Sequence, residues 1–342
     1  MADKPQISCA AAAQIKAAEE SAQRVIKAHP ELHHYTREVG LKGILESNAL
    51  RATYFADLND AQEIHALRTP LVEAFADRLM PIVKEARFRG APERHVVWRH
   101  DAPQYLARRW GNYLYEVIFS DHERKAYCCT TSFCSHVGDQ PYEREHGLLS
   151  QWRAYGGHGE YCLVFDAAAL WELFKQERGA FLYPYTDVRE AHYPRDGAKE
   201  LESFIALLDK SEAVYRTALV GRGDPDVDLT LWPFLASATA FKHQGFYEER
   251  EVRLVAMAGT ELAAEAERKV GRTPAPVKEI LKRPHAGGER RHILLFGKDF
   301  AKLPIKRVIV GPSRSQDSNA DIARKIVGAD VSVTKSETPY IG

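Results

Sequence analysis

Apolar residues recur along the chain with two periods, one typical of helices and one typical of strands. Helical spacing predicts helices over residues 10–28, 41–50, 105–119, 167–176, 199–219 and 229–242. Short runs of β-branched and aromatic residues predict strands, the clearest being Tyr161–Phe165 and Val308–Val310. Strands and helices follow one another without a regular βαβ order. We therefore expect an α+β fold with helices around a mixed, mainly antiparallel central sheet.

The same pattern suggests how the chain is divided. Residues 1–30 form a predicted N-terminal helical extension, and residues 31–342 form a predicted single α+β domain with a helical insertion around 60–120. Residues 81–101 and 261–291 are charged and lack either period, so we expect loops there. Internal repeats and low-complexity segments are absent from the sequence.

Composition narrows the class of protein. Of the 342 residues, 45% are hydrophobic, which is enough for a sizeable core. Lys and Arg together number 47, as do Asp and Glu, and this balance argues against a polybasic nucleic-acid binder. No apolar run approaches the roughly 20 residues of a membrane helix. Five irregularly spaced cysteines suit reduced thiols, so we expect a cytoplasmic protein without a membrane partner.

Four polar clusters are candidates for chemistry. The first is the predicted strand His33–Thr36, in which His34, Tyr35 and Thr36 offer ring and hydroxyl groups to a ribose or an amide. A structural histidine near a strand end is the alternative explanation. The second cluster is Asn59 and Asp60 with Glu63, where the two acids share a helix face. They would hold a metal or a substrate hydroxyl, or else simply cap the helix.

The third cluster is a short helix that ends in two glycines. It carries one amide, two aromatic rings and one guanidinium, from Gln151, Trp152, Tyr155 and Arg153. An arginine offers a fork for phosphate, and the aromatic rings offer stacking faces for a base or a nicotinamide. The alternative is an aromatic plug in the core, with the arginine reaching out to solvent.

The fourth cluster lies where a buried strand begins. If that strand starts near Glu249, then Glu249, Glu251 and Arg253 share one face, and Lys242 and His243 precede them. Acids at the entry of a buried strand cost stability unless they are paired, and function is one reason to keep them. A structural ladder of ion pairs is the alternative.

Two further patterns carry less weight. Cys128, Cys129, Cys134 and His136 lack the spacing of a zinc site, so we expect no metal there. A basic patch lies at residues 283–292, and a solvated loop explains it as readily as contact with nucleic acid does.

Taken together, these clusters resemble a bacterial family filed as domain of unknown function 2971. The resemblance rests on five motifs in order: "LKGILESNAL", "LND" with "AQE", "LSQWRAYGGHGEYCLVFD", "KHQGFYEEREVRLV" and "VIVGP". It covers most of residues 32–312. The family's description gives no function.

A second resemblance does imply a function. The strand "HHYT" followed by "GLKGILESNAL" is similar to the opening of ADP-ribosyltransferases of the His-Tyr-Glu type, which include DNA-modifying toxins. The resemblance implies that His34 holds the ribose of NAD and that Glu251 supports catalysis. It also implies that an aromatic ring, Tyr155 before Trp152, stacks on the nicotinamide. The segments "ND" and "SQWRAYG" depart from that family's pattern.

This second resemblance leads to the main functional hypothesis. The chain would consume NAD as its substrate, cleave the nicotinamide–ribose bond and pass ADP-ribose to nucleic acid, protein or water, with a role in defence or as a toxin conceivable. Arg153, Lys242 or Arg253 would neutralise the pyrophosphate, Asn59 and Asp60 would bind the nucleotide, and Glu249 would act on the acceptor. Two alternatives stay open. One is a non-catalytic nucleotide or nucleic-acid sensor, and the other is a metal-dependent hydrolase built on Asp60, Glu63, Glu249 and Glu251.

Overall fold

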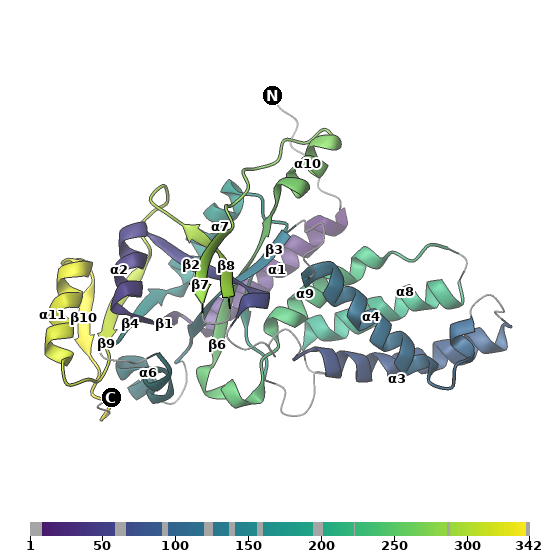
Figure 1. Cartoon of the computed structure of the whole chain (residues 1–342), viewed down its shortest axis with the longest axis horizontal. Coiled ribbons are helices and arrows are strands. Elements are labelled where there is room, and N and C mark those ends of the chain that lie inside the picture. Colours follow the sequence, from purple (N-terminus) through teal and green to yellow (C-terminus); the bar gives the residue numbers. More distant parts are fainter. Residues whose placement is uncertain are drawn as a thin grey trace. The chain divides into compact units, whose positions relative to one another are not determined.

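Ten strands of the described residues form one sheet, and in this computed structural model it is antiparallel except where β9 meets β10. The structure describes residues 9–58, 66–90, 95–119, 126–136, 141–155, 160–193, 201–221, 223–285 and 288–339. Helices surround the sheet (Figure 1), which confirms the predicted α+β class. No helix among these residues is both long and apolar enough to cross a membrane.

The chain divides into two compact units. Unit 1 takes its residues from the segments 1–54, 125–190 and 248–342, and unit 2 from 55–124 and 191–247. Unit 1 holds the whole sheet, whose strands are β1 (Glu31–Arg37), β2 (Ala49–Tyr54), β3 (Ala126–Cys134), β4 (Glu160–Asp166), β5 (Tyr185–Glu190), β6 (Glu251–Gly259), β7 (Leu281–His285), β8 (Gly288–Phe296), β9 (Ile305–Val310) and β10 (Ser332–Lys335). Its helices are α1 (Cys9–Ala28), α2 (Glu38–Ser47), α5 (Pro141–His146), α6 (Leu149–Tyr155), α7 (Ala167–Ala180), α10 (Glu261–Lys269) and α11 (Gln316–Val327).

Strand β3 is the junction of the sheet. It pairs with β6 along its whole length, from Ala126 opposite Gly259 to Cys134 opposite Glu251. Its other edge is shared between two strands. Strand β1 pairs with it only at His33 opposite Cys134, and β2 pairs with its middle residues Cys129 and Thr130. The strand order beyond β1 is β4, β9 and β10, and beyond β2 it is β8 and β7. The register across β3 therefore determines which side chains of distant segments share a face.

Local sequence explains the elements around this junction. Strand β4 carries a continuous apolar run that is buried throughout, as expected for a central strand. Asp166 ends β4 and caps α7, since its carboxylate accepts a hydrogen bond from the backbone N–H of Ala169 at 2.9 Å. Asn48 ends α2 in the left-handed conformation at φ 53°, which asparagine tolerates better than most residues.

Unit 2 is built from helices. These are α3 (Arg68–Phe88), α4 (Ala102–Phe119), α8 (Glu202–Leu219) and α9 (Leu231–Ala240), with short 3-10 turns at Phe55–Asp57, His95–Trp98, Val227–Thr230 and, at its border, Gln244–Glu249. Helix α3 packs against α4 and α8, and α9 packs against α4 and α8. The indole of Trp110 donates to the Ser211 hydroxyl at 2.8 Å in this core.

Two predicted loops are regular structure instead. Helix α3 continues through Pro81 to Phe88, because seven buried residues along it face the core of unit 2. The segment 261–291 holds α10 and β7, and the proline of β7 is tolerated because this strand is the last in the sheet.

Candidate functional site

Residues on one face of the unit 1 sheet line up across five strands. Directly paired residues point to the same face, and the pairs join Arg307 to Val164, Val164 to His33, His33 to Cys134 and Cys134 to Glu251. We call this side the His33 face. Two strand spacings separate His33 from Glu251, or about 10 Å between their backbones. A histidine from β1 and a carboxylate from β6 therefore share one side of the sheet.

His34 lies on the opposite side. Successive strand residues alternate, so the prediction that His34 shares a pocket with Glu251 is wrong for this register. The Nδ1 of His34 bonds the Ser132 carbonyl at 3.1 Å, and its ring lies 5.6 Å from that of Phe133. Thr36 shares the His34 face, whereas Tyr35 points to the His33 face. The three residues predicted to act together are thus split between two faces.

Two buried imidazoles meet on the His33 face. The ring centroids of His33 and His136 are 4.4 Å apart, and the two residues are 1% and 3% exposed. Burial lowers the pKa of His33 to about 4, although a hydrogen bond to the Arg144 carbonyl raises it in part. Burial, with His33 nearby, lowers the pKa of His136 to about 2. Both rings are therefore neutral near pH 7.

Each of these rings keeps one nitrogen without a partner in the described part of the chain. His33 donates from Nε2 to the Arg144 carbonyl at 3.3 Å, so its bare Nδ1 is a hydrogen-bond acceptor. Tyr35 bridges to His136 Nε2 at 2.8 Å and accepts from the Leu148 N–H at 2.7 Å. When the Tyr35 hydroxyl donates, Nδ1 of His136 carries the proton and is a donor. A buried acceptor and a buried donor thus lie side by side.

Glu251 is fixed in place by its own strand. Arg253 donates from two guanidinium nitrogens to the two carboxylate oxygens, each at 2.9 Å, and both residues are at most 3% exposed. The predicted common face of Glu251 and Arg253 is confirmed. Glu249 does not join them, because β6 begins at Glu251 and Glu249 lies in the preceding 3-10 turn. The backbone turns sharply between the two at Arg250, with φ 42°.

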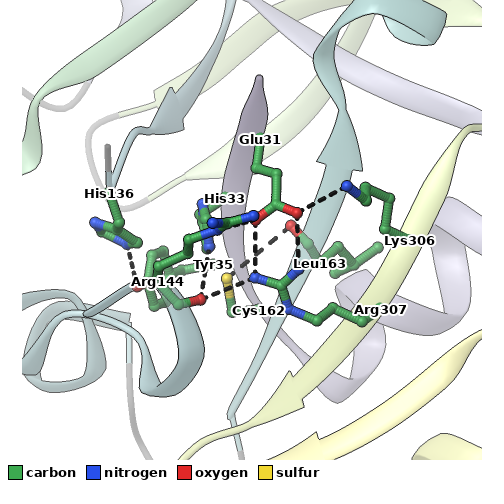
Figure 2. Close-up of polar contacts among 9 residues, drawn as sticks. All are labelled: Glu31, His33, Tyr35, His136, Arg144, Cys162, Leu163, Lys306 and Arg307. Atoms are coloured by element: carbon green, nitrogen blue, oxygen red, sulfur yellow. Dashed lines mark hydrogen bonds and ion pairs between the residues drawn. The ribbon is translucent and has the colours of Figure 1, made fainter. Parts of the chain in front are cut away.

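A cluster of charges centred on Glu31 lies beside the histidines (Figure 2). The buried Glu31 carboxylate accepts from Arg144 at 2.9 Å, from Lys306 at 2.8 Å and from Arg307 at 3.0 Å. We call these four residues the Glu31 cluster. Burial raises the pKa of Glu31, but the three cations outweigh it and hold the pKa far below its usual range. Three positive charges thus face one negative charge.

The Glu31 cluster and the histidine pair are connected. The backbone carbonyl of Arg144 accepts from Arg307 at 2.9 Å as well as from His33. Figure 2 shows the His33 ring and the Arg307 guanidinium at this one carbonyl. Sequence analysis missed the cluster because its members come from three distant segments. The early signal in the sequence was the acid Glu31, two residues before the predicted strand His33–Thr36.

Helix α6 covers the His33 face with Trp152, which packs edge-on against Tyr35 at 4.8 Å. The indole donates to the His146 carbonyl at 2.9 Å, and the ring is 2% exposed. These contacts match the alternative of an aromatic plug in the core, and stacking of Trp152 on a ligand stays a prediction. Gln151 is also buried, and Arg153 is exposed. The side chain of Tyr155 lies outside the described residues.

The remaining predicted site residues belong to unit 2 or lie outside the described residues. Asn59, Asp60 and Glu63 lie outside the described residues, so nothing tests their assignment. Lys242 and His243 belong to unit 2, where the Lys242 ammonium lies 4.9 Å from the Phe246 ring centroid. Within the described ranges, no three His, Cys, Asp or Glu side chains gather as metal ligands would.

Comparison with known proteins adds one finding. Residues 151–254 match the model of a family described as Protein of unknown function (DUF2971). The predicted resemblance to this family is confirmed over that segment, which includes α6 and the start of β6. No curated protein and no solved structure matches the chain.

Proposed function

We propose that the chain binds NAD on the His33 face and cleaves its nicotinamide–ribose bond, passing ADP-ribose to an acceptor or to water. The observation that carries this proposal is the paired row from His33 through Cys134 to Glu251. The resemblance to ADP-ribosyltransferases requires a first-strand histidine and a late-strand glutamate on one side. His33 meets that requirement in place of His34.

The chemistry needs a fixed negative charge near the ribose. The bond between ribose C1′ and the nicotinamide nitrogen breaks, and its electron pair leaves with nicotinamide. Positive charge then develops on the sugar, as in glycoside cleavage. A water or acceptor hydroxyl forms the new C1′–O bond and loses its proton to solvent. The carboxylate of Glu251, held rigid by Arg253, would stabilise the charged sugar without rearranging.

The surrounding groups suit the rest of the dinucleotide. The Nδ1 of His33 would accept a hydrogen bond from a ribose hydroxyl, since it is buried without a hydrogen-bond partner among the described residues. The excess positive charge of the Glu31 cluster suits a pyrophosphate, since arginine forks match phosphate oxygens. Arg144 and Lys306 are the more exposed of its cations and would make the contacts. Four buried free cysteines in unit 1 fit the proposed cytoplasmic location.

The test is nicotinamide release from NAD by the pure protein, with DNA, RNA, protein or water as acceptor. We expect Glu251→Gln and His33→Ala to lower the rate at least about 100-fold. His34→Ala is the matched control, one residue away on the other face, and should change the rate less than about threefold. Thermal unfolding of each variant, with Glu251→Asp added, separates lost catalysis from lost folding.

Two outcomes would contradict the proposed cleavage of NAD. One is no release with any acceptor, and the other is equal loss in the His33 and His34 variants. A second candidate function then follows from one observation, namely that Arg253 occupies both oxygens of a nearly buried Glu251. A carboxylate so engaged suits a non-catalytic nucleotide sensor. Saturable binding of ADP-ribose without nicotinamide release would establish that sensor.

A further inference from the structure

We infer that unit 2 binds the surface of an anionic lipid bilayer through the end of its α3–α4 pair, where Phe88 and Trp98 are exposed among arginines. The 3-10 turn that ends at Trp98 lies between these two helices at one end of the unit (Figure 1). We call Phe88, Trp98, Arg87, Arg89 and Arg99 the aromatic tip. All five belong to unit 2, so the inference does not rest on NAD cleavage.

Two large aromatic side chains of the tip are exposed to solvent. Phe88 is the last residue of α3 and is 93% exposed, more than any other large apolar side chain that the structure describes. Trp98 is 56% exposed, whereas Phe75 of the same helix α3 is fully buried. Neighbouring apolar groups left in water favour contact with another apolar phase. A bilayer surface can surround a side chain as exposed as Phe88 on all sides.

Arg87 holds the two aromatic segments together. Its Nε donates to the Val97 carbonyl at 2.6 Å, and its Nη2 donates to the Arg99 carbonyl at 2.7 Å. These carbonyls belong to the residues on either side of Trp98, and Phe88 follows Arg87 in the chain. The two rings are therefore presented by adjoining segments that the guanidinium fixes. A fixed turn loses less conformational freedom when it binds.

The segments around the tip are positive, although the whole chain has a net charge of zero. The described residues 84–90 and 95–109 hold six Lys and Arg against two Asp and Glu, and residues 91–94 add one of each sign. The two described acids form ion pairs, Glu85 with Arg89 at 2.6 Å and Asp101 with Arg99 at 2.9 Å. Attraction to an anionic surface depends on the net charge, so these pairs do not have to break.

Exposed aromatic rings beside excess cations suit the boundary between the headgroups and the acyl chains of a bilayer. Phenylalanine inserts there, the indole of tryptophan keeps its N–H near the headgroups, and arginine matches their phosphates. The expected lack of a membrane partner rested on spanning helices, which binding at a surface does not need. A single-stranded nucleic acid also attracts cations, but it stacks on aromatic rings spaced along a groove. The two rings of the tip lie at one end of a helix pair instead.

The experiment measures sedimentation of the full chain with phosphatidylcholine vesicles that contain about 30% phosphatidylserine, without NAD. The unchanged protein should bind them at least about 10-fold more tightly than pure phosphatidylcholine vesicles, and more weakly as salt is added. The Phe88→Ser/Trp98→Ser double variant should weaken binding about 30-fold by removing the inserted rings. The matched control is Val39→Ser/Val270→Ser, which removes two exposed apolar side chains of unit 1 and should leave binding unchanged.

Lipid binding at the tip is ruled out by a chain that stays in solution with the anionic vesicles, or by equal weakening in the tip variant and the valine control. Tip-dependent binding of a short single-stranded DNA without vesicle binding would overturn the inference in favour of nucleic acid. A dimer that the tip variant abolishes, again without vesicle binding, would show that the tip joins two copies of the chain. Because NAD is absent, none of these results depends on whether the chain cleaves it.

Discussion

Two cationic regions of unit 1, the Glu31 cluster and the hairpin of β7 and β8, differ in how their buried polar groups are paired. In the Glu31 cluster, three cations surround one buried carboxylate, and each has a defined partner. At the edge of the sheet, Arg283 of β7 is the cross-strand partner of Arg290 of β8, and the Nε of Arg283 is buried without a hydrogen-bond partner among the described residues. The Glu31 cluster pairs its buried carboxylate within the protein and keeps an excess of positive charge. The hairpin leaves a buried donor of Arg283 unpaired, and an unpaired buried donor costs stability.

The largest expected effect on stability comes from removing the carboxylate of Glu31. Glu31→Gln removes the buried charge that holds three cations together and leaves the partly buried Arg307 without its acid. Breaking a buried ion pair from one side costs about 4 kcal/mol of unfolding free energy. Urea unfolding measures it, and Glu289→Gln is the matched control because its exposed pair with Lys282 is worth under about 0.5 kcal/mol. A loss of unfolding free energy below about 1 kcal/mol would show that the Glu31 charge does not hold the three cations in place.

The second effect is a pH dependence of the unfolding free energy, which arises from the two buried histidines on the His33 face. An unfolded histidine takes up a proton near pH 6.5, whereas folded His33 stays neutral to about pH 4 and His136 to about pH 2. Between pH 6.5 and 4 the unfolded state binds more protons, so stability falls as the pH falls. Each histidine contributes about 3 kcal/mol over this range.

His136→Gln separates this contribution from the others. The variant should lose about 3 kcal/mol less than the unchanged protein when unfolding is followed from pH 6.5 to 4. The depressed pKa of Glu31 adds its own loss only below about pH 4.5, where unfolded glutamates become protonated. Equal pH dependence of the two proteins would mean that His136 is not held neutral by burial.

The histidine pair also shows what a sequence can and cannot predict. In β1, the apolar residues Leu32 and Tyr35 lie on opposite faces, so the hydrophobic pattern does not decide whether His33 or His34 faces β6. The pairing with β3 decides it, and that pairing is long-range. The alternation of Glu251 with Val252, in contrast, is local and was predicted correctly.

Other elements also show that local patterns are predictable from sequence whereas long-range contacts are not. The buried strand β4 and most helices were predictable from periodicity, because their patterns are local and strong. Strand β7 was missed because its proline and its charges are typical of a loop, and only the edge position in the sheet accommodates them. The sequence left Trp152 open between a ligand platform and a core plug, because its burial depends on Tyr35, more than one hundred residues earlier.

The smallest expected changes in stability compare the two cationic regions most directly. Arg144→Gln removes a partly exposed cation from the Glu31 cluster and should destabilise the fold by about 0.5 kcal/mol. Arg283→Gln removes a repulsive cross-strand pair and should instead stabilise it by about 0.5 kcal/mol. Added salt screens exposed charges, so the difference between the two variants should shrink at 1 M salt. Thermal unfolding at low and high salt measures both signs, and destabilisation by Arg283→Gln would mean that contacts inside the chain outweigh the repulsion between Arg283 and Arg290.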